Sequence, residues 1–505
     1  MLSRRIYGMM KNNGNLTCFV VDSSVNRSVD GNAFLMSNNL NRRDFLKRAG
    51  LGAAAAVLPG CTQVAGRLGG GKAKDRPNII FIMADDLGYA DLGCYGQELI
   101  QTPCVDQMAR EGMRFTQCYA GACVCAPSRS VLMTGQHTGH TRVRENKCRV
   151  GGVRDEITGG GCRLPLKDED VTVAEVLKKA GYATGITGKW GLGEAGTSGV
   201  PTRQGFDEWL GYLNQNHAVY YYTDYLWRNE EKVILGGNKG GRRQQYTHDL
   251  FTEFALDFIR NHRNAPFFLY VAYTIPHFNI EVPGTEPYTN KPWPEKAKIF
   301  AAMITRMDRD VGRILKLLEE LGIDDNTIVF FCSDNGGAGN GGPMFNSNGS
   351  LKGDKGGFDE GGIRSPMVVR WPAKVPAGKV SDASWYYADV MPSLAELAGV
   401  KPPKDIDGVS VLPTLLGKQQ NLDDRFMYWE SPPPKLHQVV RWQHWKARRR
   451  RPSRPLELYN LAEDLREERN VADKHPDVVA RFETYLKTAR TDSPNWPMEK
   501  ISRKR

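Results

Sequence analysis

The amino-acid sequence predicts an α/β fold, in which a doubly wound, mostly parallel or mixed sheet is flanked by helices and followed by a smaller C-terminal α+β domain. Short runs rich in branched and aromatic residues alternate along the chain with amphipathic segments of helical period. This alternation is typical of a parallel sheet with crossover helices. After about residue 400 the apolar runs become shorter and only one further amphipathic segment follows. That change indicates a second, smaller unit.

Apolar runs predict the central strands of the sheet. The run at 78–83, NIIFIM, is continuous rather than alternating, as expected for a strand that is buried on both faces. Further runs lie at 184–187, 266–273 and 327–332. We expect these four segments to be parallel strands of one sheet.

Amphipathic segments between these runs predict the flanking helices. We expect helices at 104–112, 171–180, 249–262 and 301–321, and a last helix near 476–489. Within 249–262, the side chains of Phe251, Phe254 and Phe258 recur at spacings of three and four and so share one face. A helix with one such apolar face packs that face against the sheet.

The chain divides into three predicted regions. An N-terminal extension covers 1–76, a large α/β domain covers 77–400, and a C-terminal α+β subdomain covers 401–505. The boundary near 400 is placed at the segment Lys-Pro-Pro-Lys at 401–404, which is typical of a linker.

The N-terminal extension carries an export signal. The segment 41–47, with Arg42 and Arg43, matches a twin-arginine motif, and the apolar stretch 51–58 that follows is too short to span a bilayer. The next residues, Leu-Pro-Gly-Cys ending at Cys61, resemble a lipobox. We therefore expect a periplasmic or otherwise extracytoplasmic protein. The only membrane contact we expect is through a lipid anchor at Cys61, and the sequence leaves open whether this anchor is present.

Charge and cysteine content limit the kinds of partner that we expect for the chain. The net charge is +11, and residues 1–61 contribute eight Lys/Arg against three Asp/Glu. A basic run at 446–454 lacks interleaved aromatic residues, so we expect a surface loop and no nucleic-acid partner. The ten cysteines have no zinc-type spacing, and their pairing is left open.

The segment Cys-Ala-Pro-Ser-Arg at 125–129, followed by Met-Thr-Gly at 133–135, carries the chemistry. Pro127 suits a first helical turn and Gly135 can end the helix, so Cys125 is expected where backbone N–H groups favour an anion. The pattern C-x-P-S-R with a following T-G resembles the signature of type I sulfatases, members of the alkaline phosphatase superfamily. The resemblance implies that a sulfatase-maturating enzyme converts Cys125 to formylglycine (3-oxoalanine), whose hydrate attacks sulfur.

Polar residues follow two of the predicted strands. Asp85 and Asp86 come directly after the strand at 78–83, and Asp334 and Asn335 come directly after the strand at 327–332. Ligands of open α/β sheets bind at the carboxyl ends of the strands, and an oxygen-only donor set suits Ca²⁺, or Mg²⁺, rather than zinc. The same four residues match the metal ligands of the sulfatases one by one.

Four further residues match the sulfatase pattern. The resemblance implies that Arg129 offsets charge on the nucleophile, that Lys189 and Lys355 bind the sulfate group, and that His277 protonates the departing alcohol. Lys189 and His277 also follow predicted strands, at 184–187 and 266–273.

One position departs from the family. Many sulfatases have a histidine, which is held to act on the formylglycine diol, where this chain has Gly191. His217 or His140 are the candidates to replace it, and His217 is also a candidate for substrate binding.

The sequence therefore predicts a sulfuric ester hydrolase that acts on an extracytoplasmic sulfated carbohydrate. The stretch 212–227 resembles bacterial sulfatases that act on galactose or N-acetylgalactosamine sulfates, and its aromatic block at 220–227 could line a sugar site or be a packed loop. Two alternatives remain: a phosphodiesterase or phosphonate monoester hydrolase of the same superfamily, and a non-catalytic glycan-binding relative. The sugar, endo or exo action and the oligomeric state are left open.

Overall fold

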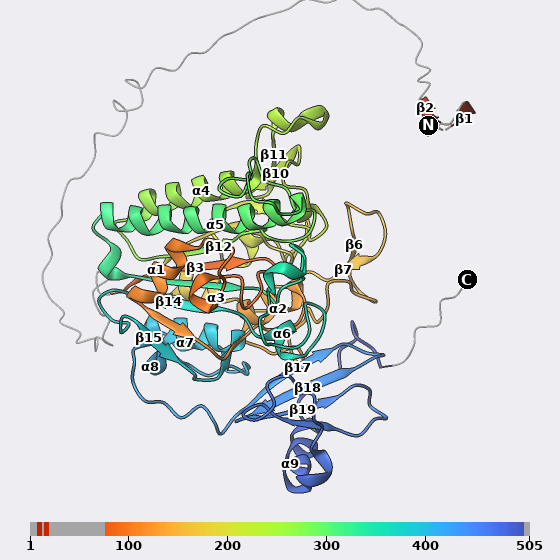
Figure 1. Ribbon diagram of the computed structural model, residues 1–505, viewed down its shortest axis with the longest axis vertical. Helices are drawn as coiled ribbons and strands as arrows, with labels where there is room; N and C mark the ends of the chain where they lie inside the picture. Colours follow the sequence, from red (N-terminus) through yellow and green to blue (C-terminus); the bar gives the residue numbers. More distant parts are fainter. Residues whose placement is uncertain (1–7, 13–14, 20–75, 499–505) are drawn as a thin grey trace, which may run out of the picture. The chain divides into compact units, whose positions relative to one another are not determined.

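The computed structural model describes residues 8–12, 15–19 and 76–498 (Figure 1). The chain divides into two units, and the boundary lies between residues 69 and 70. In the first unit, strands β1 (Gly8–Asn12) and β2 (Asn15–Phe19) form an antiparallel hairpin. The predicted twin-arginine motif at Arg42 and Arg43 and the lipobox at Cys61 lie outside the described residues.

A ten-stranded mixed sheet forms the centre of the second unit, as the sequence predicts. Its order is β11-β10-β9-β8-β12-β3-β13-β14-β4-β15. The middle is parallel and consists of β9 (Glu208–Tyr212), β8 (Ala183–Lys189), β12 (Phe267–Ala272), β3 (Asn78–Ala84) and β13 (Thr327–Ser333). On one side antiparallel β10 (Tyr225–Arg228) and β11 (Glu231–Ile234) follow, and on the other β14 (Met367–Arg370), β4 (Met113–Phe115) and β15 (Lys379–Ser381).

The side chains of the central strand β3 divide between two cores. Ile79, Phe81 and Met83 pack with helices α2 (Cys125–Thr134), α3 (Val173–Lys179) and α7 (Val390–Leu397). Ile80 and Ile82 face the opposite core with α1 (Pro103–Glu111), α4 (Thr247–His262) and α5 (Glu295–Glu320), and the last two lie side by side in Figure 1. Helices on both faces explain why the sequence of β3 is apolar throughout.

Helix boundaries follow local capping residues more closely than apolar periodicity. α3 begins after Thr172, whose hydroxyl accepts the backbone N–H of Glu175 while the Glu175 carboxylate accepts that of Thr172. α5 begins at Glu295, earlier than the predicted 301, because Pro294 precedes the first turn and Ala297 and Phe300 extend the apolar face.

The large α/β region also contains several short elements. They are β5 (Cys118–Tyr119), β6 (Val153–Arg154), β7 (Cys162–Arg163), β16 (Trp385–Tyr386), α6 (Glu360–Ile363) and α8 (Leu412–Leu415). Cys162, the first residue of β7, forms a disulfide with Cys148, a pairing that the sequence leaves open. Among the described helices, none is long and apolar enough to cross a membrane.

The C-terminal region is a four-stranded antiparallel sheet covered by one helix. The strands are β17 (Phe426–Ser431), β18 (His437–Trp442), β19 (Trp445–Arg449) and β20 (Glu457–Asn460), and the helix is α9 (Pro476–Leu486). The indole N–H of Trp429 donates to the backbone oxygen of Ala120, so this sheet is attached to the segment that directly follows β5.

The expectation that the basic run at 446–454 is a surface loop is wrong for its first half. Lys446 is buried in β19, with its ammonium 3.0 Å from Glu360 Oε1 and 3.1 Å from Glu467. Arg448 is also buried, and its guanidinium pairs with Asp359 and Glu457. Buried positive charges are stable only when carboxylates surround them, and here carboxylates from distant segments do so.

Candidate active site

The carboxyl ends of the parallel strands bring the predicted residues together. β3 leads into Asp85 and Asp86, and β13 leads into Asp334. β8 ends on Lys189, and His277 follows β12 in the next loop. These strands are neighbours in the sheet, so residues far apart in the sequence meet at one edge.

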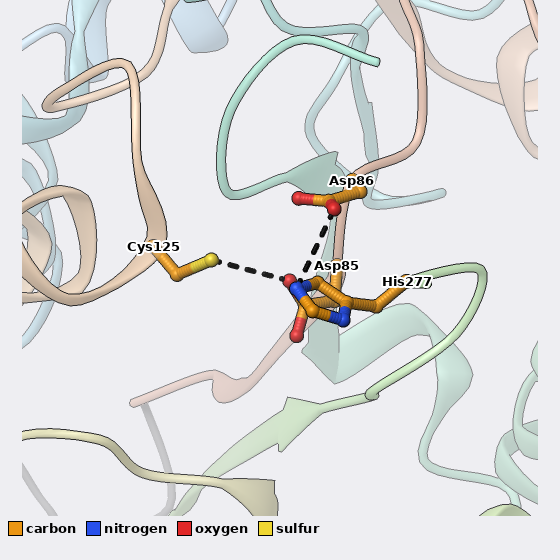
Figure 2. Close-up of side chains that lie close together, drawn as sticks. All are labelled: Asp85, Asp86, Cys125 and His277. Atoms are coloured by element: carbon orange, nitrogen blue, oxygen red, sulfur yellow. Dashed lines mark hydrogen bonds and ion pairs between the residues drawn. The ribbon is translucent and has the colours of Figure 1, made fainter. Parts of the chain in front are cut away.

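Cys125 begins helix α2 and points toward the end of β3 (Figure 2). Its sulfur lies 3.5 Å from Asp85 Oδ1 and 3.3 Å from the Lys355 ammonium, and the side chain is 1% exposed. The helix ends at Gly135, which has φ +69° and donates its N–H to the carbonyl of Val131. The predicted helix between Cys125 and Gly135 is therefore confirmed.

The backbone at the start of α2 differs from expectation. The N–H of Ala126, expected to be free for an anion, donates to Asn146 Oδ1 at 2.9 Å. Asn146 lies in the loop after the helix, and no motif in the sequence marks it. The groups that face the Cys125 side chain are therefore side chains rather than this N–H.

Three carboxylates and one carboxamide converge beside Cys125. The backbone N–H of Asp86 donates to Asp334 Oδ1, and Asn335 Nδ2 donates to Asp86 Oδ1 at 2.9 Å. Asp86 has φ +66°, a left-handed conformation that turns the chain sharply after β3. The buried Oδ1 of Asn335 has no hydrogen-bond donor. With Asp85, these residues form an oxygen-rich donor set that fits a hard divalent cation.

Three cations balance the three carboxylates. The Lys189 ammonium lies 2.6 Å from Asp85 Oδ2, and the Lys355 ammonium lies 2.7 Å from Asp86 Oδ1. Arg129 donates to Asp334 Oδ2 at 2.8 Å and 3.1 Å and to the backbone oxygen of Lys189. A divalent cation held by the carboxylates would leave an excess of positive charge, which suits an anionic substrate.

Burial and charge set the protonation states of the site. Burial alone would raise the pKa of the Asp85 carboxyl. The neighbouring positive charges, above all that of Lys189, outweigh this effect and lower the pKa to about 2. Burial also raises the pKa of the Cys125 thiol to about 12, and the charge of Asp334 adds to this effect. At neutral pH the thiol is therefore protonated and is a poor nucleophile.

His277 lies beside Asp85, Asp86 and Cys125. Its Nε2 is 3.5 Å from Asp86 Oδ2, and its buried Nδ1 has no hydrogen-bond partner. Burial lowers its pKa, and the charges of Asp85 and Asp86 oppose that shift. The ring of Phe278, which is 50% exposed, lies against the imidazole with 4.3 Å between centroids.

Comparison with known proteins assigns the chain to a family. The family model described as Sulfatase matches residues 77–400, which include every residue of this site. The chain belongs to the sulfatase family. This family is part of the alkaline phosphatase superfamily. A second model, N-sulphoglucosamine sulphohydrolase, C-terminal, matches residues 353–492.

Named relatives of this sulfatase cover most of its length. An N-acetylgalactosamine-6-O-sulfatase of Bacteroides thetaiotaomicron is 30% identical over 86% of this chain and 97% of its own. The N-acetylgalactosamine-6-sulfatase of Canis lupus familiaris is 35% identical over 76% of this chain and 71% of its own. The solved structure of Ps i-CgsB in complex with k-i-k-neocarrahexaose has a TM-score of 0.71 at 28% identity, covering 84% of this chain and 95% of that one.

The two histidines considered as replacements at Gly191 lie elsewhere in this sulfatase. His217 Nε2 shares a hydrogen bond with Thr223 Oγ1, and its ring lies between those of Tyr212 and Tyr225. His140 Nδ1 contacts the carboxylate of Asp407. Neither belongs to the close group of Asp85, Asp86, Cys125 and His277.

The side chain beside Gly191 is that of Gln215, which sequence reasoning missed. Gly191 has φ +76°, and a Cβ built on it would lie 2.0 Å from Gln215 Nε2. The only signal in the sequence was the glycine itself, because a left-handed residue with no side chain leaves room for a neighbour.

Proposed function

We propose that this sulfatase removes sulfate from a sulfated carbohydrate outside the cytoplasm, through a formylglycine formed at Cys125. The observation that carries the proposal is the position of Cys125 at the start of α2, within reach of Asp85 and Lys355. Residue 125 is thereby surrounded by charges that can bind both a cation and an anion. The substrate we favour is a galactose or N-acetylgalactosamine sulfate, as in the named relatives that act on N-acetylgalactosamine-6-sulfate.

The protonated state of Cys125 supports a modified nucleophile. A thiol with a pKa raised to about 12 offers almost no thiolate at neutral pH. Oxidation to formylglycine by a sulfatase-maturating enzyme would replace it with an aldehyde, whose hydrate supplies a hydroxyl nucleophile and a second hydroxyl for release of sulfate. An ordinary serine-type ester would lack that second group.

The residues proposed to hold the metal are the oxygen donors at the ends of β3 and β13. They are Asp85, Asp86, Asp334 and Asn335, and the donor-free Oδ1 of Asn335 supports this assignment. Ca²⁺ is the ion we favour, with Mg²⁺ as the alternative, because every donor is a hard oxygen. When bound, the cation supplies positive charge next to residue 125.

The cationic side chains have separate tasks in this proposal. Lys189 and Lys355 bind oxygens of the sulfate group, and Arg129 offsets charge at residue 125. His277 passes a proton to the departing sugar oxygen, and the charges of Asp85 and Asp86 favour its protonated form. Since Phe278 presents an exposed ring beside His277, it offers a flat apolar surface for the sugar that leaves.

The twin-arginine motif at Arg42 and Arg43 supports export after folding, with or without a lipid anchor at Cys61. Export in the folded state agrees with a modification that must be complete before the protein crosses the membrane.

Sulfate release tests the proposal. Protein made together with a maturating enzyme should release inorganic sulfate from the 6-sulfates of N-acetylgalactosamine or galactose, and C125A protein should release none. Faster cleavage of an aryl phosphodiester than of any sulfate ester would favour the phosphodiesterase alternative. Binding of the sulfated sugars without release would favour the glycan-binding alternative.

A further inference from the structure

The carboxamide of Gln215 fills the space that a side chain at position 191 would take. A Cβ on Gly191 would lie 2.0 Å from Gln215 Nε2 and 2.8 Å from its Cδ. Real Cβ atoms do not approach neighbours so closely, so a side chain at position 191 would displace the Gln215 amide from the place it occupies.

The loop that carries Gln215 lies at the catalytic edge of the sheet. β9 pairs in parallel with β8, and Tyr212 at the end of β9 lies opposite Lys189. Past the strand ends, the N–H of Gly191 donates to the backbone oxygen of Leu213. Gln215 therefore lies directly beside the segment that follows Lys189, at the same edge as Asp85.

Among the described residues of the loop 213–224, Gln215 is the one whose buried side-chain donor has no acceptor. Asn214 donates its amide to Glu194 at 2.8 Å, and Asn216 donates to Asp155 at 2.7 Å. Gln215 is only 7% exposed, and its Nε2 has no acceptor in the protein. A buried amide donor without an acceptor is unfavourable, so this group is arranged to serve a ligand.

We propose that Gln215 is a substrate-binding residue of this sulfatase, whose side-chain amide donates a hydrogen bond to an oxygen of the substrate's sulfate group next to Lys189. The inference rests on the proposed function and deepens it. An uncharged donor beside an ammonium suits an anionic oxygen. A carboxamide neither gains nor loses a proton near neutral pH, so Gln215 binds the group and does not act as a base.

Kinetics of two variants test the role of Gln215. Q215A should raise both KM for the sulfate ester and the inhibition constant of inorganic sulfate about tenfold, the usual effect of losing a hydrogen bond to a charged group. Q215E keeps the size of the side chain but places a carboxylate beside the anion, so both constants should rise further. The melting temperature of each variant shows whether the fold is retained.

A neighbouring carboxamide provides the control. N216A removes the bond to Asp155, so it should lower the melting temperature and leave the inhibition constant of sulfate unchanged. Wild-type values of KM and sulfate inhibition in both Q215A and Q215E would overturn the inference while leaving the proposed function intact. If the wild type cleaves no sulfate ester, the proposed function fails. Calorimetric titration with inorganic sulfate then still tests the role of Gln215. Weaker sulfate binding by Q215A than by the wild type supports the inference, and equal binding by the two proteins overturns it.

Discussion

The ammonium of Lys355 lies 3.3 Å from the sulfur of Cys125, although 230 residues separate the two in the sequence. The same ammonium lies 2.7 Å from Asp86 Oδ1. Lys355 therefore connects the residue proposed as nucleophile to the residues proposed as metal ligands. Because these groups are buried, each of their charges interacts more strongly with its neighbours than it would in water.

Replacement of Lys355 should lower the catalytic activity of the protein. We expect K355A to lower kcat/KM for a sulfate ester by about 10²–10³-fold, because a buried cation next to the reacting group is lost. Steady-state kinetics on the matured enzyme measure this effect. The exposed Lys374 provides a matched control, and K374A should behave as the wild type. A K355A enzyme within threefold of the wild type would contradict the role given to this lysine.

The effect of replacing His277 should depend on the leaving group. If His277 protonates the departing alcohol, H277A should lower kcat on a sulfated sugar by about 10²–10⁴-fold. A nitrophenyl sulfate needs little protonation, so its turnover should fall much less. Parallel assays on the two substrates measure the difference, and equal losses on both would assign His277 to another role.

Glu194 should make the stability of the protein depend on pH. Burial raises the pKa of its carboxyl to about 8, well above that of an unfolded glutamate, so the folded protein holds this proton more tightly. Its contribution is full below about pH 4.5 and is lost as the pH rises through 8. The melting temperature of E194Q, measured from pH 5 to 9, should therefore fall less with rising pH than that of the wild type. E98Q, at an exposed site, is the control, and it should follow the wild-type curve.

Removal of the buried Lys446 should destabilise the protein strongly. Its ammonium lies between Glu360 and Glu467, and the loss of one partner leaves buried carboxylates uncompensated. We expect K446M to lower the free energy of unfolding by about 3–5 kcal/mol in chemical denaturation. R451M, at an exposed position of the same basic run, should change it by less than about 0.5 kcal/mol. Similar small losses for both variants would show that the buried pairs contribute little.

The strand-end residues of the site were predictable because sheet topology decides their position. Asp85 and Asp334 each follow an apolar run, and parallel strands deliver such residues to one edge. The burial of Lys446 was not predictable, because its partner Glu360 lies 86 residues away in the sequence. The position of Gln215 was not predictable either, because only the pairing of β8 with β9 shows that this residue lies beside Gly191.

The mass of the peptide that contains residue 125 tests the central claim most directly. Protein made together with a sulfatase-maturating enzyme should carry an aldehyde at this position. Mass spectrometry detects it as the replacement of the Cys125 sulfur by oxygen, with the loss of two hydrogens. An unmodified thiol in protein that nevertheless releases sulfate from a sugar ester would contradict the formylglycine mechanism. The predicted result is an aldehyde at residue 125 in active protein and no release of sulfate by protein that lacks the aldehyde.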